Sequence, residues 1–434
     1  MGEETGLPLL SATGASGWAP VIGIPEWMCY YANYGVQCPG PEAIDECIDA
    51  HTAMGMGILA WNCGRSTLDY WSDLPRSTAM CERGCVVGGL SWEFVRSVMT
   101  QVCPLRRALE LCHDRGMTLL GRLSMNRHYG GAEYEGVTSH FAADHPEYHE
   151  VSKLGNPVSG SLCYALAPVR QERIDILLEV QRIGVDGLVL DFCRQMPMLM
   201  YHEALVGPYM SRSGIDPRTI DGPNPPPYMD WFHYRCDVLT EFMAKLRNEV
   251  RQQERSLGKP CPIIARVPDS APWLMIAYGL DVERWCSDDL VDATLLSPFP
   301  RTVEDLDSYP EYHCRVCRRH GKPCIGGIGS LKLIENDVTH NTGFYHPQPV
   351  FAMANRQYEA GVEAMSLYQS ETLVRMDYLS DLLRVVGRPR VVADRASSLP
   401  RPELPDDYPI GKDWHSQPAG REGLRTARAG DSAL

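Results

Sequence analysis

Short runs of apolar residues alternate along this chain with longer segments in which apolar residues recur every three or four positions. The short runs are typical of strands buried on both faces, and the longer period is typical of amphipathic helices. Strands that alternate with helices form a parallel sheet, and eight such units make a closed (β/α)8 barrel. Eight runs are predicted strands, at residues 20–25, 55–61, 117–124, 186–192, 262–268, 291–297, 322–329 and 362–369.

The segments between these runs have the length and the ends that helices require. Several of them stop at a glycine just before the next strand, as Gly116 and Gly184 illustrate. Glycine is favoured there because the residue that ends a helix often adopts a left-handed conformation. The main predicted helices lie at residues 41–54, 105–116, 167–184, 228–258 and 348–361.

The same pattern predicts one large α/β domain. Residues 18–385 form the predicted barrel, preceded by an extension at 1–17 and followed by a Pro-, Arg-, Gly- and Ser-rich tail at 386–434. We expect this tail to be loosely attached. The segments that follow the second, third and fourth strands are long and carry Trp, Tyr, His and Arg. In a barrel such loops gather on the face where active sites lie.

Composition narrows the function classes. The 434 residues are 44% apolar and carry a net charge of −14, which fits a globular protein and argues against nucleic-acid or anionic-membrane binding. No apolar run has the length of a membrane span, and no signal peptide is visible, although one removed earlier would leave no trace. No nucleotide or other cofactor motif is recognised, and the oligomeric state stays open.

The 16 cysteines are mostly scattered singly in apolar contexts, which predicts buried reduced thiols rather than a disulfide framework. One cluster places Cys314, Cys317 and Cys324 beside two histidines. A lone CxxC pair is weak evidence for zinc, so we expect a helix that leads into the next strand, and no metal site.

Three sequence elements resemble the family-10-like glycosyl hydrolases. They are His145-Pro146-Glu147-Tyr148, the helix that begins at Ala167-Pro168, and the strand that runs from Asp186-Gly187 to Asp191. The resemblance implies a (β/α)8 barrel that cleaves glycans. The chain departs from the family pattern after this strand, where it has Phe192-Cys193-Arg194 in place of a second acid or a tyrosine.

Acidic residues at strand ends suggest the chemistry, because glycoside hydrolysis generally needs two carboxyl groups beside the scissile bond. Asp191 ends the fourth strand and is the first catalytic candidate. Its partner is Asp269 or Glu371, which rank nearly level, with Glu26 third. The structural alternatives are that Asp191 caps a segment or pairs with an arginine, that Asp269 caps a helix, and that Glu371 is a first-turn acid.

Aromatic, amide and basic residues near the strand ends are candidates for substrate contacts. The arginines have two interpretations: they bind an anionic (sulfated or uronic) sugar, or they orient the catalytic carboxylates and lower their pKa values. The predicted substrate-binding residues are Trp61, Arg65, Arg122, Asn126, His128, Tyr129, Arg194, His202, Arg266 and Tyr368.

Three functions are compatible with these residues. The first hypothesis is a two-carboxylate glycoside hydrolase whose partner is a poly- or oligosaccharide substrate. The second is a carbohydrate-binding barrel that has lost one acid, which the departure at Phe192-Cys193 motivates. The third is a lyase or isomerase that uses His128 and Tyr129 on a uronate.

Overall fold

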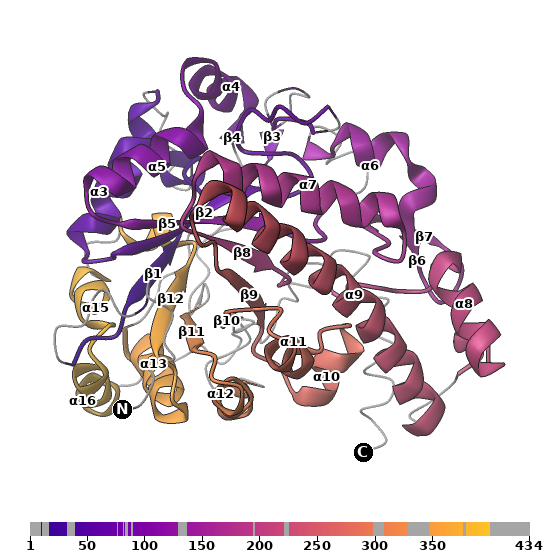
Figure 1. Ribbon diagram of the computed structural model, residues 1–434. Coiled ribbons are helices and arrows are strands. Elements are labelled where there is room, and N and C mark those ends of the chain that lie inside the picture. Colours follow the sequence, from indigo (N-terminus) through magenta and orange to yellow (C-terminus); the bar gives the residue numbers. More distant parts are fainter. Residues whose placement is uncertain are drawn as a thin grey trace, which may run out of the picture.

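The computed structural model describes residues 10, 17–32, 40–75, 77–80, 82, 86–87, 90–128, 137–193, 196–220, 225–297, 308–328, 347–375 and 379–399. Eight parallel strands close into a barrel in the order β1-β12-β11-β10-β9-β8-β5-β2, with helices around it (Figure 1). The predicted (β/α)8 barrel and its eight strands are therefore confirmed. These strands are β1 (Val21–Ile24), β2 (Ile58–Gly64), β5 (Thr118–Ser124), β8 (Gly187–Asp191), β9 (Ile263–Pro268), β10 (Ala293–Ser297), β11 (Cys324–Ile328) and β12 (Ala364–Tyr368).

Helices connect successive barrel strands on the outside. The main ones are α3 (Glu42–Ala53), α5 (Pro104–Asp114), α7 (Ala167–Ile183), α9 (Pro225–Leu257), α12 (Pro310–Arg319) and α13 (Pro347–Ala360). The others are α2 (Cys29–Ala32), α4 (Trp92–Gln101), α6 (His140–Asp144), α8 (Glu203–Ser213), α10 (Pro272–Ala277), α11 (Val282–Ser287), α14 (Ser370–Leu373), α15 (Ser380–Val385) and α16 (Pro389–Ser398). Two small antiparallel pairs, β3 (Val86–Val87) with β4 (Leu90–Ser91) and β6 (His149–Val151) with β7 (Pro157–Leu162), lie in the loops.

Glycine ends the helices as the sequence predicts. Gly184 follows α7 with a φ of +110°, and its amide donates to the carbonyl of Gln181. A residue with a Cβ is strained in this conformation, so glycine allows the chain to turn directly into β8.

The strands are buried on both faces, and their side chains alternate between the barrel interior and the layer under the helices. Leu120, Val189 and Ile264 belong to the interior cluster. Because successive side chains point to opposite faces, the residues two positions later also point inward. Those residues are Arg122, Asp191 and Arg266, which places three charged groups inside the barrel at its carboxyl end.

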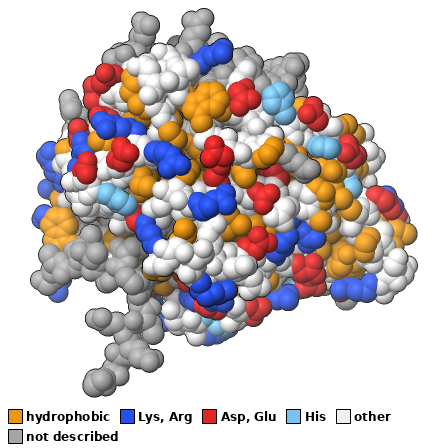
Figure 2. Space-filling view, turned by 45° about the horizontal axis from the view of Figure 1, so that its top comes forward, with side chains coloured by type: hydrophobic (Ala, Val, Ile, Leu, Met, Phe, Trp, Pro, Cys, Tyr) orange, Lys and Arg blue, Asp and Glu red, His pale blue; other side chains and the backbone are white. Residues whose placement is uncertain are grey.

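The cysteines of the described residues are free thiols, including Cys314, Cys317 and Cys324, which are buried in the core beside β11 and α12. In the described ranges, no three His, Cys, Asp or Glu side chains converge as a cation site. Of the helices in the described part of the chain, none is long and apolar enough to cross a bilayer. Acidic and basic side chains are interspersed over the face of the molecule in Figure 2.

The segment after residue 386 begins with ordered structure. Helix α16 packs against α13, and Val392 on α16 is buried in the hydrophobic core. The part of the predicted tail at 389–398 is therefore a helix on the barrel wall rather than a loose end, while residues 400–434 lie outside the described residues.

Candidate functional site

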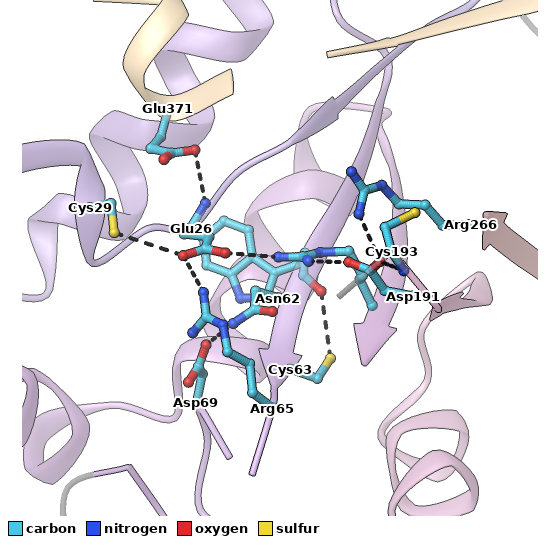
Figure 3. Close-up of polar contacts among 12 residues, drawn as sticks. Glu26, Cys29, Asn62, Cys63, Arg65, Asp69, Asp191, Cys193, Arg266 and Glu371 are labelled. Carbon is cyan, nitrogen blue, oxygen red and sulfur yellow. Dashed lines mark hydrogen bonds and ion pairs between the residues drawn. The ribbon is translucent and has the colours of Figure 1, made fainter. Parts of the chain in front are cut away.

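A chain of alternating charges crosses the carboxyl end of the barrel. The Arg266 Nη1 and Arg122 Nη1 atoms each lie 2.7 Å from an oxygen of Asp191, one on Oδ1 and the other on Oδ2. Arg122 Nη2 reaches Glu26 Oε1 at 3.3 Å, and Arg65 pairs with the other oxygen of Glu26. Arg122 therefore bridges two carboxylates from different strand ends, Glu26 and Asp191, which are labelled in Figure 3.

Asp191 is an ionised carboxylate in this arrangement. Burial by itself would raise its pKa, but Arg266 and Arg122 outweigh that effect and hold the pKa well below its usual range. The Cys193 amide also donates to Oδ1 at 3.0 Å. Both oxygens of Asp191 are therefore occupied by donors, and its side chain is fully buried.

Glu26 and Glu371 lie side by side although they are 345 residues apart in sequence. The Glu26 amide donates to Glu371 Oε2 at 3.1 Å, because β1 and β12 are neighbours in the closed barrel. Figure 3 shows the Glu371 carboxyl group directly over the Glu26 backbone. Two acids thus emerge from adjacent strand ends.

The surroundings of these two acids shift their pKa values in opposite directions. Burial opposes the ionisation of Glu26, but the charges of Arg65 and Arg122 outweigh it and lower the pKa of Glu26 to about 2. Burial and then the negative charge of Glu26 raise the pKa of Glu371 to about 8. At neutral pH one carboxyl group is ionised and the other holds a proton.

The short segment before Glu371 is held firmly. Gln369 has a φ of +55°, which is uncommon for a residue with a side chain. The next residue, Ser370, lies with its Oγ 2.7 Å from Nε2 of His51 on α3. His51 Nδ1 is 2.6 Å from the Cys47 carbonyl and donates to it, so Nε2 accepts from the serine. This contact fixes the backbone that carries Glu371.

Asn62 and Asp69 complete the site on the side of β2. Asn62 points into the barrel at the end of β2, and its Nδ2 donates to Asp69. Burial raises the pKa of Asp69 to about 6. Figure 3 shows both residues beside Arg65, so the Arg65 guanidinium lies between Glu26 and this pair.

Several predicted site residues have structural partners instead. Asp269 accepts from the Tyr309 amide at 2.8 Å and from the Ser308 hydroxyl, so it caps the start of α12. Burial raises the pKa of Asp269. Both oxygens of Asp269 are therefore bonded to the segment that leads into α12. The sequence had suggested Asp269 as the catalytic partner of Asp191.

Other predicted residues are also held by contacts within the fold. Asn126 bonds to the Leu162 amide and the Met198 carbonyl, and His202 accepts from the Ala204 amide at the start of α8. Each of the remaining positions has a different environment.

Trp61 packs in the layer under the helices, and the buried His128 has its Nδ1 3.3 Å from Ser66 Oγ. The Tyr368 ring lies against the Arg266 guanidinium, with 4.3 Å between its centroid and Cζ. Tyr129 and Arg194 lie outside the described residues.

Ionisation of Glu371 links folding to pH. Its pKa in the folded protein, about 8, exceeds the ordinary value of 4.5, so the folded state holds a proton that the unfolded state releases. The free energy of unfolding is expected to fall as pH rises from 4.5 towards 8. Urea unfolding at pH 5 and pH 8.5 measures this loss, which should be smaller in Glu371→Gln, where Asp69 and Asp269, whose pKa values burial also raises, remain. An equal loss in both proteins contradicts the assignment.

Comparisons with known proteins establish the fold. No protein-family model matches the chain, and no curated protein matches it. Solved structures of the same architecture include the PgaB (BpsB) glycoside hydrolase domain from Bordetella bronchiseptica, at a TM-score of 0.55 and 11% identity over 85% of this chain and 98% of that one. The catalytic domain of β-amylase from Paenibacillus polymyxa matches at a TM-score of 0.53 and 9% identity, over 85% of this chain and 99% of that one.

A third match is the α-L-fucosidase isoenzyme 2 from Paenibacillus thiaminolyticus, at a TM-score of 0.52 and 12% identity. It covers 86% of this chain, and this chain spans about half (49%) of the fucosidase. At these identities the likeness defines the fold: this chain has the (β/α)8 barrel that these structures share.

Proposed function

We propose that the protein is a glycoside hydrolase in which Glu371 is the general acid and Glu26 is the ionised carboxylate. One observation carries this proposal: two adjacent carboxyl groups at the carboxyl end of the barrel have pKa values of about 8 and about 2. Glycoside hydrolysis requires one protonated and one ionised carboxyl group. Paired carboxyl groups whose pKa values are pushed apart are the usual mark of such an assignment.

In the proposed reaction each side chain has a defined task. Glu371 gives its proton to the glycosidic oxygen as the bond to the leaving group breaks. Glu26 supports the positive charge that develops on the sugar and either activates water or bonds to the sugar. Asp191 acts as a positioning residue, because its two oxygens hold the guanidinium groups of Arg122 and Arg266.

The family-10-like assignment belongs to the same proposal. It is supported by the three sequence elements that include Asp191 and by the barrel, whose structural neighbours include proteins named as a glycoside hydrolase, an amylase and a fucosidase. The carbohydrate-binding alternative supposes that one acid has been lost. The guanidinium of Arg122 bonds to both Asp191 and Glu26, so a second carboxylate lies close to Asp191. This favours the hydrolase over the carbohydrate-binding barrel.

A screen of aryl glycosides and polysaccharides with product detection tests the hydrolase directly. Release of reducing ends supports hydrolysis, and an unsaturated product that absorbs in the ultraviolet indicates the lyase instead. Binding without turnover of any member of the panel would favour the carbohydrate-binding barrel.

The dependence of the rate on pH provides a more specific test. We expect kcat/KM to be level near neutrality and to fall above a pH of about 8, because Glu371 then loses the proton that it must donate. The measurement is a pH–rate profile on an aryl glycoside with a leaving group that needs protonation. The same profile on a glycoside with a very acidic leaving group is the control and should fall less. A flat profile to pH 10 on both substrates contradicts the role of Glu371.

A further inference from the structure

Three buried oxygens near the ends of β12 and β2, the two strands that flank β1, have no hydrogen-bond partner among the described residues. They are Glu371 Oε1, Gln369 Oε1 and Asn62 Oδ1. All three residues are at least nine-tenths buried. Buried polar atoms are nearly always hydrogen-bonded, so a group of unpartnered ones at one site needs an explanation.

The residues that carry these atoms lie at the ends of the two strands that flank β1. Gln369 and Glu371 follow β12, and Asn62 lies two residues before the end of β2, while β1, which Glu26 follows, lies between those two strands. Neighbouring strands are about 4.8 Å apart, so the first and last of the three oxygens are separated by roughly two strand spacings. A ring that bears hydroxyl groups on opposite edges can donate to Asn62 and Gln369 and can accept from the protonated Glu371.

The two fully buried arginines of the site, Arg122 and Arg266, have their charges balanced by the protein itself. Arg122 gives one terminal nitrogen to Asp191 and the other to Glu26. Arg266 gives one to Asp191 and the other to Ser297 Oγ, at 2.6 Å. A sulfate or carboxylate on the ligand would have to compete with these carboxylates and would be repelled by them.

We propose that the ends of β12, β1 and β2 form a subsite for an uncharged sugar ring, whose hydroxyl groups donate to Asn62 and Gln369 while the protonated Glu371 donates to a ligand oxygen. The subsite rests on the proposed hydrolase function and adds the substrate class to it. It departs from the anionic-sugar hypothesis, because the terminal nitrogens of Arg122 and Arg266 have acceptors within the protein.

The first arm of the test compares ligands by binding rather than by turnover. The probes are methyl glycosides of glucose, galactose, mannose and fucose, against the methyl glycosides of glucuronic and galacturonic acid. Saturation-transfer NMR and calorimetry on the full chain should give at least one neutral glycoside a Kd at least about tenfold lower than its charged counterpart. Tighter binding of the uronates, or no binding in either series, overturns the proposal.

The second arm removes one acceptor without disturbing the backbone. Gln369→Gly suits the φ of +55° and deletes the unpartnered oxygen, so it should weaken the neutral glycoside by about fivefold or more with an unchanged melting temperature. Asp289→Gly is the control for the change of backbone, because Asp289 also has a φ of +55° but lies in the loop before β10, at the opposite end of the barrel. It also loses ion pairs with Arg251 and Lys322, so its melting temperature should fall while glycoside binding stays unchanged. Unchanged binding in Gln369→Gly, or equal weakening in both variants, overturns the subsite.

The two proposals fail in different ways. Neutral glycosides that bind but are never cleaved would contradict the hydrolase and leave the subsite intact. Cleavage confined to uronides or sulfated sugars would support the hydrolase and overturn the neutral subsite.

Discussion

Replacement of Glu371 by glutamine is expected to reduce kcat by roughly 10²- to 10⁴-fold, the range that a general acid contributes. The amide oxygen of glutamine can still accept from the Glu26 amide, which now lies 3.1 Å from Glu371 Oε2. The fold should therefore persist, but the variant has no carboxyl proton to donate to the leaving group. Steady-state kinetics on an aryl glycoside measure the effect, and circular dichroism checks the fold.

The same variant should also change the pH profile. The fall in kcat/KM above a pH of about 8 should disappear, because the group that titrates there has been removed. Glu363→Gln is a matched control: Glu363 immediately precedes β12, at the opposite end of that strand, and is exposed, so activity should stay near wild type. Near-normal turnover in Glu371→Gln would remove Glu371 from the mechanism.

Replacement of Asp191 by asparagine is expected to impair both stability and activity. A catalytic carboxylate in open contact with substrate could be neutralised at little cost to the fold. Asp191 instead faces the fully buried guanidinium groups of Arg122 and Arg266. Breaking a buried ion pair by removing one partner costs about 3–5 kcal/mol. Arg266 would keep its contacts with the Ser297 hydroxyl and the Tyr368 ring but would lose its charged partner.

Denaturant unfolding and kinetics on the folded fraction separate the two effects. Turnover should fall because Arg122, released from Asp191, no longer holds Glu26 in the same position. Asp292→Asn is the control: it breaks the pair with Arg247 at the amino end of the barrel, where Asp292 is partly exposed. That variant should lose less stability and keep its activity. A Glu26 pKa and a melting temperature unchanged in Asp191→Asn would contradict the positioning role.

Much of the fold could be predicted from local pattern alone. The eight apolar runs became the eight barrel strands, because a strand buried on both faces needs apolar residues at consecutive positions. Helix ends such as Gly184 were recognisable because few residues other than glycine adopt that conformation without strain. The position of Asp191 at the carboxyl end of β8 also followed from its place after an apolar run.

The assignment of partners could not be predicted in the same way. Asp269 and Glu371 each follow a strand, and their sequence contexts gave no reason to separate them. In the folded chain Asp269 accepts from the Tyr309 amide at the start of α12. Glu371 accepts from the amide of Glu26, the acid that the sequence ranked lowest. His51 and Asp69 carried no sequence signal, because their relevance comes from contact with Ser370 and Asn62.

The sequence by itself determined the barrel and the end of it at which acids and arginines gather. The apolar period of each segment is a local property, and the alternation of strands with helices makes the strands parallel. The tertiary structure decided which acids meet, because closure of the barrel brings β12 to β1 and so joins residues 345 positions apart. It also decided their ionisation, since a pKa depends on burial and on charges contributed by distant strands, here Arg65 and Arg122 beside Glu26.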